Sequence, residues 1–173
     1  MKITPPSFDE LSTYYQEYWK YLSGNDLIEA LEKQSDSVLA LINQIPANKE
    51  DFRYGEGKWM VKELIGHLID VDRILSYRAL RFARNDQTAL ASFDEDQYMI
   101  ESNFKSRSLK DIALEWNTVR KATLSLFANL HPSTLDRKGI AGSSQVSPRI
   151  ILYFILVHEY HHIEILKNRY LSV

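Results

Sequence analysis

Among the residues of this chain, the histidines have a type and a spacing that would allow chemistry. His158 and His162 stand four residues apart near the C-terminal end. On a helix, two such side chains leave the same face with Cβ atoms about 6 Å apart, so two ring nitrogens can reach one metal ion at about 2.0 to 2.1 Å. The sequence contains no cysteine, so histidines and carboxylates must supply the ligands of any metal site.

A third inward-facing histidine would complete an open three-histidine site. His67 lies three residues after Leu64 and four before Val71, on or beside an apolar helical stripe. A lone histidine on such a face is usually a core residue bonded to a carbonyl or hydroxyl group. The pair His158 and His162 changes this balance, because two stacked imidazoles are poor neighbours without a shared cation. We therefore expect His67, His158 and His162 to hold one divalent metal ion.

The residues 158–162 also fit the pattern H-E-x-x-H, in which the glutamate is the general base of a zinc protease. Such proteases take a third ligand from downstream, but only eleven residues follow His162, and the sequence shows no substrate-binding sheet. A protease is therefore disfavoured, and Glu159 is either a catalytic base or a surface residue. We expect His161 to face solvent or a subunit contact, and His131 to be only a helix-end residue.

Four long helical segments must position these side chains. Glycine and proline cluster at a few places, and the stretches between them carry apolar residues at helical spacing. The run 150–157 is continuously apolar and could be a buried strand, but Ser147 and Pro148 form a good helix start and the later spacing is helical. The expected helices cover residues 26–45, 58–84, 109–130 and 148–166, with a shorter amphipathic helix within 11–22 and a long loop over 87–107.

Length and charge limit the classes of function. The 173 residues, 45% of them apolar, fit one domain over 1–173. With 21 basic against 23 acidic residues there is no excess positive charge for nucleic acid or an anionic membrane. The N-terminus lacks a signal-peptide core, and the longest apolar run is too short to span a bilayer. We expect a soluble, cytoplasmic protein that acts on a small molecule.

The second and fourth helical segments resemble the DinB/YfiT-like four-helix metalloproteins. The resemblance rests on a tryptophan, Trp59, before a helix that carries H-L-x-D at 67–70, and on H-x-x-x-H at 158–162. The segment 92–97, Ser-Phe-Asp-Glu-Asp-Gln, is similar to the loop after the second helix in the YfiT branch. The resemblance extends over most of the chain, and it rests on the order and separation of these motifs taken together.

The resemblance implies an all-α, up-down-down-up four-helix bundle, often dimeric, with zinc, or alternatively nickel, on His67, His158 and His162. Asp70, one turn after His67, is expected to orient that ring as a hydrogen-bond acceptor, or else to be a helix-surface carboxylate. Trp59 would pack at the helix start or contribute to the site.

Three functions remain open from the sequence. Relatives of the thiol-transferase branch imply transfer of a low-molecular-weight thiol such as bacillithiol to an electrophile, because an open three-histidine site activates a bound nucleophile. The loop with Asp94 and Glu95 would then help to close the site. The alternatives are a metal-dependent hydrolase and a non-enzymatic, metal-stabilised binding or stress-response module.

Overall fold

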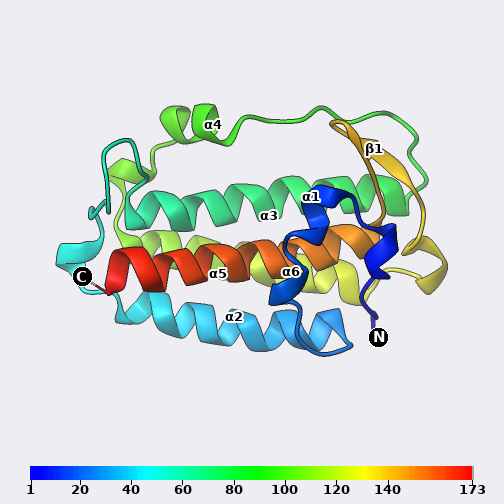
Figure 1. The fold of residues 1–173 in the computed structure, drawn as a ribbon, viewed down its shortest axis with the longest axis horizontal. Coiled ribbons are helices and arrows are strands. Elements are labelled where there is room, and N and C mark those ends of the chain that lie inside the picture. Colours follow the sequence, from blue (N-terminus) through cyan, green and yellow to red (C-terminus); the bar gives the residue numbers. More distant parts are fainter. Residues whose placement is uncertain (173) are drawn as a thin grey trace.

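The computed structural model describes residues 1–172 and contains four long helices (Figure 1). The prediction of an all-helical bundle with a short N-terminal helix is confirmed, except for one small hairpin described below. Within the described residues the long helices are α2 (Leu27–Gln44), α3 (Val61–Ala83), α5 (Leu109–Ala128) and α6 (Pro148–Ile165).

The order of helix directions places a long connection over the bundle. In Figure 1, α2 and α6 run one way and α3 and α5 run the other, which is the up-down-down-up order. Because α3 and α5 follow each other in the chain and are parallel, the segment between them must return along the length of α3. This connection contains α4 (Glu95–Glu101) and the short turn η4 (Phe104–Ser106).

Side-chain caps set the helix starts that the sequence predicted. The hydroxyl of Ser108 accepts the backbone N–H of Asp111 at 3.2 Å, and that of Ser147 accepts the N–H of Ile150 at 3.3 Å. Pro148 occupies the first turn of α6, where its missing N–H costs nothing. The continuously apolar run that could have been a strand is therefore a helix, and it is buried on most sides.

Two helices begin later than predicted, because other caps compete. The carboxylate of Asp26 accepts the backbone N–H of Ile28 at 3.1 Å, so α2 starts one residue after the expected position. The carboxylate of Glu63 accepts the backbone N–H of Met60 at 2.7 Å, which fixes the start of α3 at Val61.

A hairpin between α5 and α6 was not predicted. Strands β1 (Gly139–Ala141) and β2 (Ser144–Val146) are antiparallel, with Ile140 opposite Gln145. The turn contains Gly142 at φ +60°, a backbone conformation that favours glycine. Three-residue strands around such a turn give too little alternation for a sequence pattern to reveal.

The hairpin is joined to the connection that follows α3. The backbone N–H of Leu90 donates to the carbonyl of Ile140 at 2.9 Å, and the N–H of Gly142 donates to the carbonyl of Leu90 at 2.8 Å. A Cβ atom on Gly142 would stand 3.2 Å from the Cβ of Ser92, so the two segments are in close contact. Together they form a continuous wall beside α3.

The N-terminal segment packs against α6 through aromatic rings. It contains η1 (Phe8–Glu10), α1 (Thr13–Gln16) and η2 (Trp19–Tyr21). The ring of Phe154 on α6 lies with its centroid 4.6 Å from that of Tyr15. The remaining short elements are η3 (Ala47–Lys49), η5 (Pro132–Thr134) and a π-helical end, η6 (Leu166–Leu171), that continues α6.

A buried ion network joins three of the long helices. Arg120 on α5 donates to Asp72 on α3 at 2.9 Å and to both carboxylate oxygens of Glu159 on α6, at 2.9 and 2.8 Å. The three side chains are at most 4% exposed. Thr123 also donates to Asp72 at 2.6 Å, and Trp116 donates to Glu159 at 3.1 Å.

None of the helices over residues 1–172 is long and apolar enough to cross a membrane.

Removing Arg120 should strongly destabilise the bundle. The change Arg120→Leu leaves two buried carboxylates without their counter-ion, and we expect it to lower the free energy of unfolding by about 3 to 5 kcal/mol. Urea unfolding followed by circular dichroism measures this loss. The matched control is Arg73→Leu, which breaks a partly exposed pair with Glu115 and should cost at most about 1 kcal/mol. Equal losses for the two variants would contradict the structural role of the network.

Candidate metal centre

Three histidines from two antiparallel helices converge at one end of the bundle. His67 comes from the second turn of α3, and His158 and His162 come from consecutive turns near the end of α6. One ring nitrogen from each of the three lies within 4.8 Å of the other two. The ring centroid of His67 lies 5.3 Å from that of His158 and 4.8 Å from that of His162. The structure thus brings together the three histidines that the sequence selected.

The distances fit a shared divalent ion. The Nε2 atoms of His158 and His162 are 3.1 Å apart. Two nitrogens bound at 2.0 to 2.1 Å to one tetrahedral metal would be separated by about 3.3 Å, so this pair needs almost no movement. A nitrogen of His67 lies within 4.8 Å of the other two, so it must move closer to complete a tetrahedral site. Imidazole nitrogens are donors that zinc, nickel and copper accept.

Burial keeps the three rings neutral, which is the state a metal ligand requires. Burial lowers the pKa of His67 from 6.5 to about 4. Burial, followed by the charges of the neighbouring histidines, also holds the pKa values of His158 and His162 well below 6.5. At neutral pH no proton must therefore leave these rings before a metal can bind.

Packing around His67 fixes its place on α3. The indole of Trp59, just before the helix, lies with its ring centroid 4.7 Å from that of His67. The preceding residue is Gly66, where a Cβ atom would stand 2.3 Å from the ring of Phe104. Only glycine lets the segment after α4 approach α3 so closely at this point.

Glu159 does not act as the predicted catalytic base. Both of its carboxylate oxygens are bound by Arg120, one of them also by Trp116, and the side chain is 1% exposed. A carboxylate held this way has no free oxygen to accept a substrate proton. Its position beside His158 instead ties the ligand-bearing turn of α6 to α5.

Of the two alternatives for Asp70, the structure agrees with the helix-surface carboxylate. Within residues 1–172, Asp70 makes no hydrogen bond to the ring of His67, and it lies half-buried in a separate surface pocket beside Arg73. His161 is half-buried, and its Nδ1 atom lies 3.3 Å from the hydroxyl of Tyr21 in the N-terminal segment. His131 is a helix-end residue as expected, since its ring accepts the backbone N–H of Ser133.

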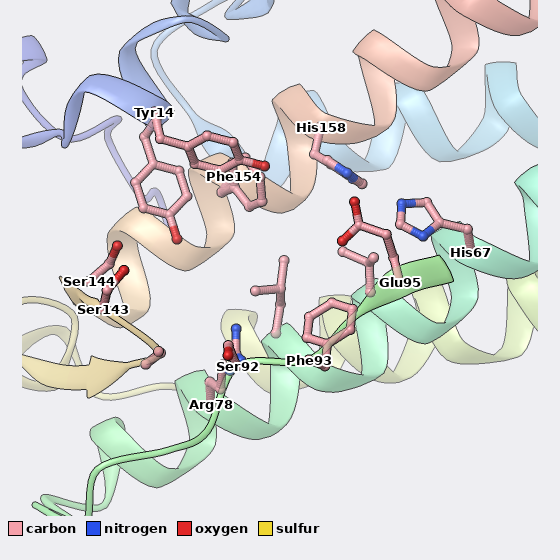
Figure 2. Close-up of a pocket in the computed structure, with 15 residues that line it drawn as sticks. Tyr14, His67, Arg78, Ser92, Phe93, Glu95, Ser143, Ser144, Phe154 and His158 are labelled. Carbon is pink, nitrogen blue, oxygen red and sulfur yellow. The ribbon is translucent and has the colours of Figure 1, made fainter. Parts of the chain in front are cut away.

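A cavity of about 350 Å³ opens on the histidine cluster. It lies between α3, α6, the N-terminal segment, the connection before α4 and the hairpin. Figure 2 shows His67 and His158 at one end and Ser143 and Ser144 at the other. This volume is within the range of sites for small molecules. A site that only ties helices together would not need such a space beside it.

Glu95 is the carboxylate that the structure places beside the histidines. It is the first residue of α4, and it lines the cavity with His67 and His158 and a smaller hollow with His162. Figure 2 shows its carboxylate close to the two labelled histidine rings. The side chain of Glu95 is exposed to solvent.

The neighbouring Asp94 has a different, structural task. Its carboxylate accepts the backbone N–H groups of Asp96 and Gln97, each at 3.0 Å, and so caps α4. The sequence grouped Asp94 and Glu95 as two loop carboxylates. The cap explains why only Glu95 turns toward the cavity.

Comparison with known proteins gives a family and a fold. A family model described as the DinB superfamily matches residues 5–166. No curated protein matches the chain. Among solved structures, YfiT from Bacillus subtilis has a TM-score of 0.72 and 16% identity, over 91% of this chain and 89% of its own. It is described as a probable metal-dependent hydrolase with an unusual four-helix bundle topology.

Two other solved structures have the same fold at low identity. A DinB-like protein of Bacillus subtilis, YjoA, has a TM-score of 0.58 and 16% identity, over 82% of this chain and 86% of its own. A mycothiol-dependent maleylpyruvate isomerase has a TM-score of 0.65 and 8% identity, and the match covers 91% of this chain but 62% of the isomerase. At these identities the likeness establishes the arrangement of helices alone.

The buried histidines should make the stability of the metal-free protein depend on pH. In the unfolded chain His67 titrates near 6.5, but its folded pKa is about 4, so the unfolded state binds more protons between these values. The contribution of neutral His67 to the free energy of unfolding is therefore fully present above about pH 6.5, and it is lost as the pH is lowered toward 4. Between pH 7 and pH 5, His67 alone should account for about 2 kcal/mol.

Urea unfolding of chelator-treated protein at several pH values measures this effect. The variant His67→Gln should show a shallower loss of stability on acidification than the wild type. The control His131→Gln removes an exposed histidine and should leave the slope unchanged. A wild-type stability that is flat or rises from pH 7 to pH 5 would show that these rings are not held neutral by burial.

Proposed function

This chain belongs to the DinB superfamily, and from that premise we propose that it is a metal-dependent enzyme whose ion is held by His67, His158 and His162. The observation that carries the proposal is the cavity that is lined by two of the three clustered histidines, His67 and His158. A divalent metal on three neutral imidazoles would keep its full charge and an open position, and it would lower the pKa of a thiol or water there to near neutral pH. Zinc is our first choice and nickel the alternative.

We propose that the reaction is transfer of a low-molecular-weight thiol to an electrophilic small molecule. The sulfur forms a bond to carbon as the bond from that carbon to its leaving group breaks, and the leaving group departs with its electron pair. The thiol proton passes to Glu95, whose carboxylate lies at the cluster and whose oxygens bind no other described residue. The description of one structural relative as mycothiol-dependent supports a thiol as co-substrate.

Hydrolysis is the second function that an observation favours. YfiT, which shares this fold, is described as a probable metal-dependent hydrolase. With water in place of the thiol, the same proton acceptor and the same cavity would serve cleavage of an ester or amide. The apolar part of the cavity wall, which includes Val71, Leu75, Phe93 and Phe154, suits a partly apolar organic substrate in either reaction.

Metal content should depend on the three clustered histidines and on no other. We expect about one metal ion per chain in the wild type, and a large loss in His67→Ala, His158→Ala and His162→Ala, because two imidazoles bind far more weakly than three. Elemental analysis of the purified variants measures this. The control His161→Ala keeps all three ligands and should retain its metal. Full occupancy in His67→Ala together with loss in His161→Ala would refute the ligand assignment.

Thiol transfer should be measurable with simple co-substrates. Metal-loaded protein is incubated with bacillithiol, mycothiol, glutathione or cysteine and a bimane or halo-aromatic electrophile. Turnover should fall more than about 100-fold in His158→Ala, since loss of an outer partner of a metal ligand alone costs 10- to 100-fold. Glu95→Gln should keep its metal but turn over more slowly, because the amide cannot accept the thiol proton.

The same preparations separate the competing functions. Cleavage of ester or amide substrates that requires the metal, with no turnover of any thiol, would replace transfer by hydrolysis. Full metal occupancy with neither reaction would favour a binding module.

A further inference from the structure

The end of the cavity away from the histidines is polar and cationic. Arg78, Ser92, Ser143 and Ser144 line it, and Figure 2 shows them away from His67, with Arg78 near Ser92 and with Ser143 beside Ser144 on the hairpin. Arg78 comes from α3, whereas the three serines come from the connection after α3 and from the hairpin, which are joined by the backbone bonds described above. The polar end is therefore as well defined by the fold as the histidine end.

Arg78 at this end has no acidic partner. Its Nη2 atom donates to the backbone carbonyl of Ala91 at 2.7 Å, and its guanidinium lies 5.6 Å from the ring centroid of Phe93. Within the described residues no carboxylate forms an ion pair with it, whereas Arg73, Arg120 and other arginines each have one. Burial lowers the pKa of Arg78, but the side chain stays a cation, because no arginine side chain loses its proton near neutral pH.

The guanidinium has donors to spare. An arginine has five N–H groups in a rigid fork, and only one hydrogen bond from this fork to another of residues 1–172 is present. A half-buried cation with unused donors, beside hydroxyl groups and at the end of a cavity, is suited to receive a carboxylate in a two-pronged hydrogen bond.

Helix geometry places Arg78 and His67 on the same stripe of α3. They are eleven residues apart, which is close to three full turns, and Val71 and Leu75 lie between them on the same side. Eleven residues span about 16 Å along the axis, and an arginine side chain points back toward the helix start. A ligand that touches both ends must therefore reach across roughly 10 to 13 Å, about the length of an extended tripeptide.

We propose that Arg78, with the hydroxyl groups of Ser92, Ser143 and Ser144, forms an anion-binding subsite for a carboxylate of the thiol co-substrate. The inference rests on the proposed function, because it assumes that the sulfur end of the same molecule lies at the histidines. Anchoring the remote carboxylate holds the sulfur at the reacting end and reduces the freedom that is lost on reaching the transition state. The substrate class is thus a thiol of tripeptide size with an acidic group at the far end.

Binding measurements with sulfur-capped ligands test the subsite apart from catalysis. The probes are the S-methyl derivatives of glutathione and bacillithiol and their carboxylate esters, titrated calorimetrically into metal-loaded protein. We expect at least one acid to bind ten or more times more tightly than its ester. In Arg78→Gln the acid should lose about tenfold in affinity and become equal to the ester, whereas Arg78→Lys should keep a preference for the acid.

The control is Arg84→Gln, which removes an exposed arginine just beyond the same helix and should change nothing. Circular dichroism of each variant checks the fold, because Arg78 also bonds the connection at Ala91. The proposal is overturned if neither acid binds, if acid and ester bind equally to the wild type, or if Arg78→Gln weakens both equally. Arg78-dependent binding of an acid without any thiol turnover would keep the subsite and reject the transferase.

Discussion

The arrangement of the site depends on the ion pairs that the buried guanidinium of Arg120 forms. The guanidinium connects Asp72 on α3 with Glu159 on α6, and these two helices carry all three clustered histidines. Glu159 directly follows His158, and Asp72 lies five residues after His67. A buried network of this kind favours one arrangement of the helices, because each charged group that loses its hydrogen bonds in the interior costs free energy. A rotation or slide of either helix that displaced a clustered histidine would also move Asp72 or Glu159 away from Arg120.

The parallel order of α3 and α5 supplies the rest of the cavity. It forces the intervening connection to run back along α3, and this connection brings Ser92, Phe93 and Glu95 over the stripe that begins at His67. The hairpin closes the far end by pairing with the same connection. A bundle with adjacent antiparallel helices and short loops would present its histidines to a bare surface. The topology thus turns a pair of ligand-bearing helices into an enclosed site with two chemically different ends.

Aromatic side chains complete the enclosure from the N-terminal side. Tyr14 and Tyr15 line the cavity, and Phe154 packs between them and the ring of His158. His161, although adjacent to a clustered histidine, is held on this aromatic segment by Tyr21. A one-residue difference on a helix is a rotation of about 100°, which is enough to give neighbouring histidines unrelated environments.

The four long helices and the choice of three histidines could be predicted from the sequence, because both depend on local spacing: apolar residues that recur every three or four positions, and two histidines four residues apart on an inward face. The surroundings of the carboxylates could not be predicted in this way. Glu159 matched a catalytic pattern but meets Arg120, thirty-nine residues away, while Glu95 resembled any loop acid and yet faces the cavity. A carboxylate has the same composition in either role, and what differs is the partner that the long-range packing of helices places beside it.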